Sequence, residues 1–137
     1  MKQNGHCSIV IVDDDGMMRS VLRLILAEAG HEVVAEAGNG EAALAAIARH
    51  RPDAVCLDIN MPGESGLEVL EKIRADHPGV AVIMITGDAS ADSVKDAVAK
   101  GARGYVLKPF NPARIFAALE ACLPPSSGGA PGKAAST

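Results

Sequence analysis

Aromatic residues are scarce in this sequence: tryptophan is absent, and aromatic residues make up 2% of the chain. Cysteine is also rare. The three cysteines, Cys7, Cys56 and Cys122, lie far apart and form no C-x-x-C pair, and no histidine stands at ligand spacing from them. This pattern argues against a zinc site and against a disulfide framework, so we expect reduced and mostly buried thiols.

Long apolar runs and an excess of positive charge are missing as well. No apolar stretch approaches the length that spans a membrane, and the first residues lack the apolar core of a signal peptide. The formal net charge of -4 argues against an electrostatic grip on nucleic acid. We therefore expect a cytoplasmic protein that contacts no membrane and does not itself bind nucleic acid.

Hydrophobic residues are plentiful, at 48% of the 137 residues, which is enough for one domain with a sizeable core. Short apolar runs predict β-strands at residues 8–12, 32–35, 54–57, 80–85 and 104–107. Three of these runs are almost purely apolar, as is typical of strands buried on both faces of a parallel sheet. A helical pattern of apolar residues follows each run, so strand and helix alternate along the chain.

Local signals mark several helix ends. Gly30 is expected to stop the first helix, because glycine readily adopts the conformation that closes a helix. Ser65 and Glu68 have the spacing of a capping box, which predicts a helix start. The fourth helix has one apolar stripe, formed by Val94, Ala97, Val98 and Gly101. Because this stripe is narrow and its residues are small, we expect the fourth helix to be weakly anchored.

Five β-then-α units predict an α/β fold, a doubly wound, flavodoxin-like five-stranded parallel sheet with five helices on its two faces. Right-handed crossovers leave few topologies, of which the order 2-1-3-4-5 is the leading one. This order places the first and third strands side by side. We expect the folded domain to span residues 8–123, after an N-terminal extension at 1–7 and before a flexible tail or cut linker at 124–137, which has no large apolar residue.

Polar residues follow four of the predicted strands at the point where each ends: Asp13, Asp14 and Asp15 after the first, Asp58 after the third, Thr86 at the fourth and Lys108 after the fifth. Each alone has an ordinary explanation as a turn residue, a helix cap or a surface charge. The carboxyl ends of parallel strands meet at one edge of the sheet, however, so these residues are expected to gather there. Such a coincidence favours a functional site.

Carboxylates in one crevice repel one another. Two like charges about 5 Å apart at an effective dielectric of about 20 cost roughly 3 kcal/mol, so the site needs a counter-charge. Lys108 can supply one, and a compact cluster of hard oxygens also suits Mg²⁺. A magnesium ion usually accompanies a phosphate, and with the acids neutralised an oxygen of Asp58 becomes a feasible nucleophile toward phosphorus.

The motifs Ile-Val-Asp-Asp-Asp, Leu-Asp-Ile-Asn-Met-Pro-Gly, Ile-Thr-Gly and Gly-Tyr-Val-Leu-Lys-Pro-Phe occur in this order between Ser8 and Leu123. In sequence and spacing they resemble the receiver domain of bacterial two-component response regulators. The resemblance implies the same CheY-like fold. It also implies Mg²⁺ as cofactor, with Mn²⁺ able to substitute. The implied metal ligands are Asp13, mainly through water, Asp14, Asp58 and the main-chain carbonyl of Asn60.

The same resemblance implies the roles at the phosphoryl group. Asp58 would be the phosphoacceptor, and Asp58, Lys108 and Thr86 together would be the catalytic set. Lys108 would contact the phosphate and would be joined to Pro109 by a cis peptide bond. Thr86 and Tyr105 would form the switch pair. For Asp15, a solvated helix cap and a metal ligand remain open alternatives.

Partners follow from the resemblance too. A sensor histidine kinase or a histidine phosphotransfer protein would supply the phosphoryl group, and slow autodephosphorylation would remove it, so the chain is not an enzyme in the ordinary sense. The fourth helix, fifth strand and fifth helix would signal to a downstream protein or to a missing output domain. The implied state is a monomer or a phosphorylation-dependent dimer. Kinase contact through the first helix near Met17, Met18 and Leu22, together with the loop after Lys108, is implied, although ordinary helix packing explains the three helix residues equally well.

Two other classes of function are open at this point. The acidic triplet contains the D-x-D pattern of haloacid dehalogenase-type phosphatases, but that group places its nucleophile on the first strand and needs a cap domain for which this chain has no room. An interaction module that kept the fold without phosphorylation is the other alternative. The intact set of Asp58, Thr86 and Lys108 argues against it.

Overall fold

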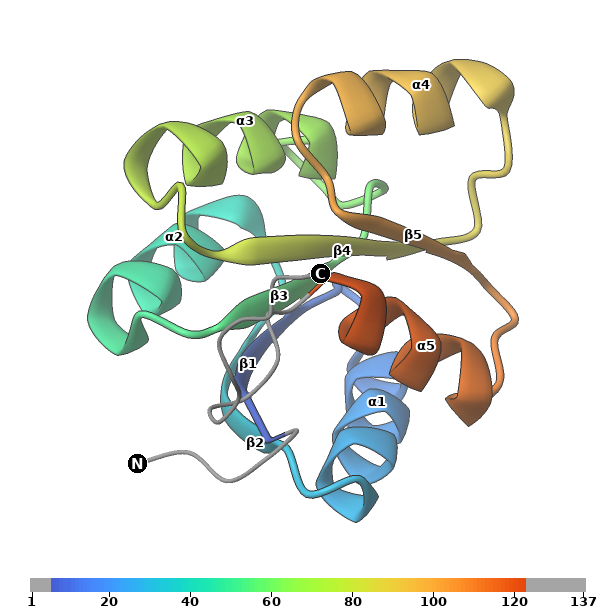
Figure 1. Ribbon diagram of the computed structural model, residues 1–137. Coiled ribbons are helices and arrows are strands. Elements are labelled where there is room, and N and C mark those ends of the chain that lie inside the picture. Colours follow the sequence, from blue (N-terminus) through green and yellow to red (C-terminus); the bar gives the residue numbers. More distant parts are fainter. Residues whose placement is uncertain (1–5, 123–137) are drawn as a thin grey trace, which may run out of the picture.

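The computed structural model describes residues 6–122, which alternate strand and helix throughout (Figure 1). The elements are β1 (Ser8–Val12), α1 (Gly16–Glu28), β2 (Glu32–Ala37), α2 (Gly40–His50), β3 (Ala54–Leu57), α3 (Gly66–Asp76), β4 (Ala81–Thr86), α4 (Ala91–Ala99), β5 (Gly104–Leu107) and α5 (Pro112–Cys122). The tail predicted at 124–137 lies outside the described residues.

The sheet is parallel, and its order is β2-β1-β3-β4-β5, which confirms the predicted topology. The first and third strands are neighbours because the chain winds outward in both directions from β1. Val12 pairs with Leu57 in the register of β1 and β3, so the residues that follow these two strands leave the sheet at the same level. This register determines where the site lies.

Alternate residues of the central strands face two separate cores. On one face, Val10, Val55, Leu57, Val82 and Met84 pack with buried residues of α2, α3 and α4. On the other face, Ile9, Ile11, Cys56, Ile83 and Ile85 pack with buried residues of α1 and α5. Figure 1 shows the resulting three layers, with α2, α3 and α4 on one side of the sheet and α1 and α5 on the other.

The helix ends predicted from Gly30 and from the capping box of Ser65 and Glu68 are confirmed. Gly30 has a φ of 89°, and α1 ends just before it. Ser65 caps α3, and the capping box with Glu68 is present. Two strand boundaries were wrong by one or two residues: β2 continues to Ala37, and β4 runs from Ala81 to Thr86.

The predicted stripe of α4 was wrong at Val98. Ala97 is the buried residue of this helix, whereas Val98 is 62% exposed. Consecutive helical residues point about 100° apart, so a helix that rests on Ala97 turns Val98 toward solvent. The narrow contact agrees with the expected weak anchoring of α4.

The described part of the chain contains no helix long and apolar enough to cross a membrane. Cys56 is buried and Cys7 is half-buried, and neither forms a disulfide. Burial raises the pKa of the Cys56 thiol to about 12, so this thiol stays protonated. The side chain of Cys122 lies outside the described residues.

Candidate functional site

The ends of β1 and β3 deliver two buried aspartates to one place. Asp58 donates its main-chain N–H to the carbonyl oxygen of Val12 at 3.0 Å, and Asp13 donates to Ala37 at 3.0 Å. These bonds continue the sheet for one residue beyond each strand. Asp13 is 1% exposed and Asp58 is 5% exposed, so both carboxyl groups have left bulk water.

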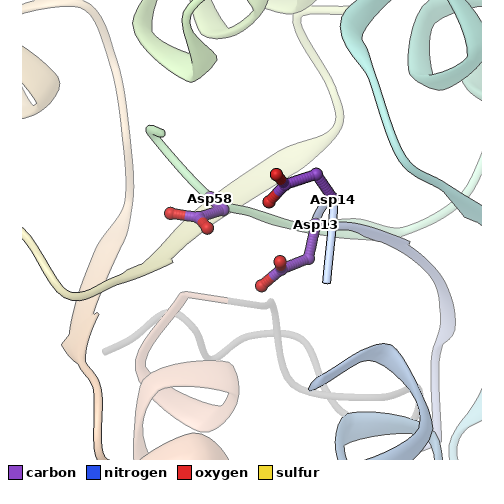
Figure 2. A group of neighbouring side chains, drawn as sticks. All are labelled: Asp13, Asp14 and Asp58. Carbon is purple, nitrogen blue, oxygen red and sulfur yellow. The ribbon is translucent and has the colours of Figure 1, made fainter. Parts of the chain in front are cut away.

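Asp14 joins these two residues from the exposed side. Carboxylate oxygens of Asp13, Asp14 and Asp58 all lie within 4.8 Å of one another. Figure 2 shows the three side chains turned toward the same space. Three carboxylates converging in this way form a donor set of hard oxygens, which suits Mg²⁺ better than a softer transition metal.

Lys108 reaches the cluster from the end of β5. Its Nζ atom donates to Asp13 Oδ2 at 2.7 Å and to Asp58 Oδ2 at 3.1 Å. Burial alone would lower the pKa of Lys108, but hydrogen bonds and attraction from Asp13 and Asp58 outweigh it and raise the pKa above its usual value. The ammonium therefore stays charged and offsets part of the carboxylate repulsion. The peptide bond between Lys108 and Pro109 is cis.

The chain after Asp58 is shaped by the start of α3. Asn60 donates its main-chain N–H to Asp58 Oδ1 at 3.3 Å, and Gly66 donates to the carbonyl oxygen of Ile59 at 2.8 Å. A Cβ atom at position 66 would overlap the carbonyl oxygen of Asp58. Glycine is therefore required for α3 to begin this close to the main chain of Asp58.

Thr86 and Tyr105 lie on the neighbouring strands, and both contact Asp88 in the loop before α4. The buried Thr86 hydroxyl accepts the main-chain N–H of Asp88 at 3.3 Å. The Tyr105 hydroxyl donates to the carbonyl oxygen of Asp88 at 2.6 Å. Thr86 also accepts the N–H of Lys108 at 2.9 Å through its main-chain oxygen. The threonine is thus tied to the site through the backbone, and its side chain bonds to the loop.

Asp15 acts as a helix cap. Its Oδ1 accepts the main-chain N–H groups of Met17 at 3.0 Å and Met18 at 3.4 Å. The same residue donates its own N–H to Asp13 Oδ1 at 2.9 Å. These contacts favour the cap over the metal ligand, the two alternatives that the sequence left open.

One residue at the site was missed by sequence reasoning. Arg19 of α1 donates from Nη1 to the main-chain oxygen of Asp13 at 2.6 Å. In the sequence Arg19 reads only as a polar residue between apolar positions of an amphipathic helix. The sequence does not reveal this contact, because the acceptor is a main-chain carbonyl group and every residue has one. The contact can be seen only in the folded structure.

Comparison with known proteins agrees with this geometry. The sequence matches the response regulator receiver domain over residues 9–120. It is 42% identical to the chemotaxis protein CheY of Listeria monocytogenes over 112 residues, which cover 82% of this chain and 94% of that protein. It is 36% identical to the probable transcriptional regulatory protein TcrX of Mycobacterium tuberculosis, over 85% of this chain but 49% of that protein.

A solved structure gives the same result. A chain of the CheX-CheY-BeF3-Mg+2 complex from Borrelia burgdorferi superposes with a TM-score of 0.79 at 31% sequence identity, covering 82% of this chain and 85% of that chain. Fold and site together define a flavodoxin-like α/β domain with a cluster of three carboxylates where the strand order reverses. The chain belongs to the response regulator receiver domain family, the CheY-like domains of two-component systems. Members of this family are signalling proteins rather than classical enzymes.

Proposed function

We propose that the chain accepts a phosphoryl group on Asp58, in a Mg²⁺-dependent reaction, from a histidine kinase or a histidine phosphotransfer protein in the cytoplasm. The observation that carries this proposal is the convergence of three carboxylates from two strands with the Lys108 ammonium beside them. A nucleophilic carboxylate needs its negative charge balanced before it can approach a phosphoryl group. Lys108 offsets part of the negative charge at Asp58, and a Mg²⁺ ion held by the three carboxylates would offset the rest.

The donor set fits Mg²⁺. The acid cluster offers two nearly buried carboxylates and the exposed carboxylate of Asp14, and we assign a further ligand to the main-chain carbonyl of Asn60. When bound, the ion would neutralise the acids and polarise the phosphoryl oxygens. Asp14 is the residue best placed to take up an ion from solvent, because its carboxylate is exposed.

In the proposed step, an oxygen of Asp58 attacks phosphorus. A new P–O bond forms while the P–N bond to the donor histidine breaks, and the imidazole nitrogen leaves with the electron pair. Lys108 would turn from the carboxylates to an oxygen of the incoming group, and the Thr86 hydroxyl, which has a hydrogen to donate, would bind another. Attack by water on the same phosphorus would break the P–O bond to Asp58, release inorganic phosphate and restore the carboxylate.

Phosphorylation would act on the loop before α4. The modified Asp58 carries roughly one more negative charge than the free carboxylate, which would draw Thr86 and Lys108 toward it. Thr86 and Tyr105 both bond to Asp88, so a shift of the threonine would be passed to this loop. Because α4 rests on Ala97, it is the helix most easily displaced, and we assign the output face to α4, β5 and α5.

For the partner that binds the α4, β5 and α5 face, we propose only its general kind. The chain matches nearly the whole of the Listeria CheY but half of TcrX. Both a separate target protein and an output domain of the same polypeptide are therefore compatible with the proposal. Phosphorylation-dependent dimerisation through the α4, β5 and α5 face is the third arrangement that we include.

Labelling with acetyl phosphate tests the proposal. The wild-type protein with Mg²⁺ should gain a hydroxylamine-sensitive phosphoryl group, and Asp58→Asn should not. Asp76→Asn, which alters an exposed aspartate at the end of α3, is the matched control and should label normally. Persistent labelling of Asp58→Asn would reject Asp58 as the acceptor. Steady turnover of small phosphate esters would instead favour the phosphatase alternative, and failure to bind beryllofluoride would favour the unphosphorylated module.

A further inference from the structure

The main-chain carbonyl of Asp13 is held by a side chain from outside the acid cluster. Arg19 Nη1 lies 2.6 Å from this oxygen. The Nε atom of the same guanidinium lies 3.1 Å from Glu36 Oε1 on β2. Arg19 therefore bridges the edge of the sheet and the chain segment that carries the acids.

With this contact, every polar group of Asp13 has a partner. Its N–H donates to Ala37 at 3.0 Å, its Oδ1 accepts from Asp15 at 2.9 Å and its Oδ2 accepts from Lys108 at 2.7 Å. Arg19 takes the remaining acceptor, the carbonyl oxygen. The residue is thus fixed from β2, from the start of α1, from the end of β5 and from the first turns of α1.

The carbonyl matters because of what shares its peptide plane. The C=O group of Asp13 and the N–H group of Asp14 belong to one planar unit, so a partner that fixes the oxygen also fixes the direction in which Asp14 leaves it. Asp14 is the exposed member of the acid cluster, and no hydrogen bond to its carboxylate occurs within residues 6–122. Its position depends on its backbone.

The guanidinium is suited to this task. It presents donors in a rigid planar fork, so Nε can hold Glu36 while Nη1 holds the carbonyl, whereas an ammonium is a single point charge on a flexible stem. Glu36 is shared with Arg23, whose Nε lies 2.6 Å from Oε2. Hydrogen bonds from Arg23 and Arg19 outweigh the opposing effect of burial and lower the pKa of Glu36, so it stays ionised as an anchor.

We infer that Arg19 is a positioning residue for the three-carboxylate cluster: anchored by Glu36, it fixes the Asp13–Asp14 peptide so that the Asp14 carboxylate faces Asp58. The inference rests on the proposed function, since it assumes that this cluster takes up Mg²⁺. It assigns to Arg19 no contact with the ion or with the phosphoryl group. Partners that orient metal ligands in this way typically change metal affinity 10- to 100-fold when removed.

Arg23 provides a matched control. It pairs with the same glutamate from the same helix but has no bond to Asp13 in the described part of the chain. Mg²⁺ titration by isothermal calorimetry would compare the wild type with Arg19→Lys and Arg23→Lys, which both keep the positive charge. We expect Arg19→Lys to weaken Mg²⁺ binding by roughly 10-fold and Arg23→Lys to change it less than about twofold. Urea unfolding without metal checks that both variants are folded under the conditions of the titration.

The outcomes separate the inference from the function beneath it. Equal Mg²⁺ affinity in Arg19→Lys and the wild type, or an equal loss in Arg23→Lys, would overturn the role of Arg19 and leave the proposed function standing. A wild type that takes up no Mg²⁺ would overturn both. If Arg19→Lys does not fold, Glu36→Ala replaces it: binding weaker than in Arg23→Lys supports the anchor, and unchanged binding rejects it.

Discussion

Gly66 lies against the main-chain carbonyl group of Asp58, and a Cβ atom at position 66 would overlap the carbonyl oxygen. The same glycine is the first residue of α3, where its N–H bonds to Ile59 at 2.8 Å. The helix therefore begins in contact with the residue that carries the proposed chemistry. Any shift of the first turn of α3 displaces the backbone of Asp58.

Gly66→Ala tests this contact. The added methyl group must push α3 or the Asp58 backbone aside, and overpacking of this kind costs about 1–3 kcal/mol. We expect a matching fall in the free energy of unfolding in urea, together with weaker Mg²⁺ binding. Gly79→Ala is the control, because a Cβ atom there would meet nothing within 4 Å. Equal stability of the two variants would contradict the close approach.

Lys108→Met tests the counter-charge. Removing the ammonium leaves the buried carboxylates of Asp13 and Asp58 without a positively charged partner. In the absence of metal, we expect the free energy of unfolding to fall by about 1–3 kcal/mol. Saturating Mg²⁺ should reduce the difference in the free energy of unfolding between Lys108→Met and the wild type, since the ion replaces the missing positive charge.

Lys100→Met is the control for Lys108→Met. Lys100 pairs with Asp96 at 2.6 Å and with Glu71 at 3.5 Å, away from the cluster. Lys100→Met should lower the free energy of unfolding by less than Lys108→Met does, and this decrease should not depend on the Mg²⁺ concentration. The difference in the free energy of unfolding between Lys108→Met and the wild type could instead stay the same at every Mg²⁺ concentration. That result would show that the lysine and the ion do not bind the same carboxylates.

The sequence was sufficient for those features that depend on local patterns. The apolar run that ends in Asp58 and the capping box at Ser65 are readable without coordinates, because each involves residues close together in the chain. The convergence of Asp13, Asp14 and Asp58 was predictable because parallel strands share one carboxyl edge. The family resemblance added the residue roles to this geometry.

Other features depend on contacts that no sequence pattern encodes. Arg19 binds a main-chain carbonyl, which any residue could provide, so nothing in the sequence points to the bond. Val98 shares the apolar character of its neighbours, but the rotation of α4 on the sheet decides which of them is buried. The bond from Tyr105 to Asp88 likewise depends on how the loop before α4 is folded.

Tyr105→Phe tests the link between β5 and the loop before α4. The substitution removes the 2.6 Å hydrogen bond to Asp88 and keeps the ring. We expect a loss of about 1 kcal/mol in the free energy of unfolding and faster amide hydrogen exchange between Asp88 and Val94. Exchange in β1 should follow the global stability alone. Unchanged exchange in the loop would mean that the tyrosine does not hold it.

The stability of the fold should depend on pH through His31, which lies just before β2, at the end of the sheet opposite the acid cluster. Its Nδ1 accepts the main-chain N–H of Cys7 at 3.1 Å, which requires an unprotonated nitrogen. Burial and, to a lesser extent, the neighbouring His6 lower the pKa of His31 from 6.5. The unfolded chain then binds more protons than the folded one below that pH, so the free energy of unfolding should fall as the pH drops below about 6.5.

His31→Asn isolates this effect. The side-chain oxygen of asparagine can accept the same N–H from Cys7 but does not titrate in this range. Urea unfolding at a series of pH values should therefore give similar stabilities at about pH 8, where His31 is neutral in both states. Toward about pH 5 the wild type should lose more stability than the variant, because only the wild type must keep an imidazole neutral in order to fold. Parallel pH profiles would show that His31 does not contribute to the acid sensitivity of the fold.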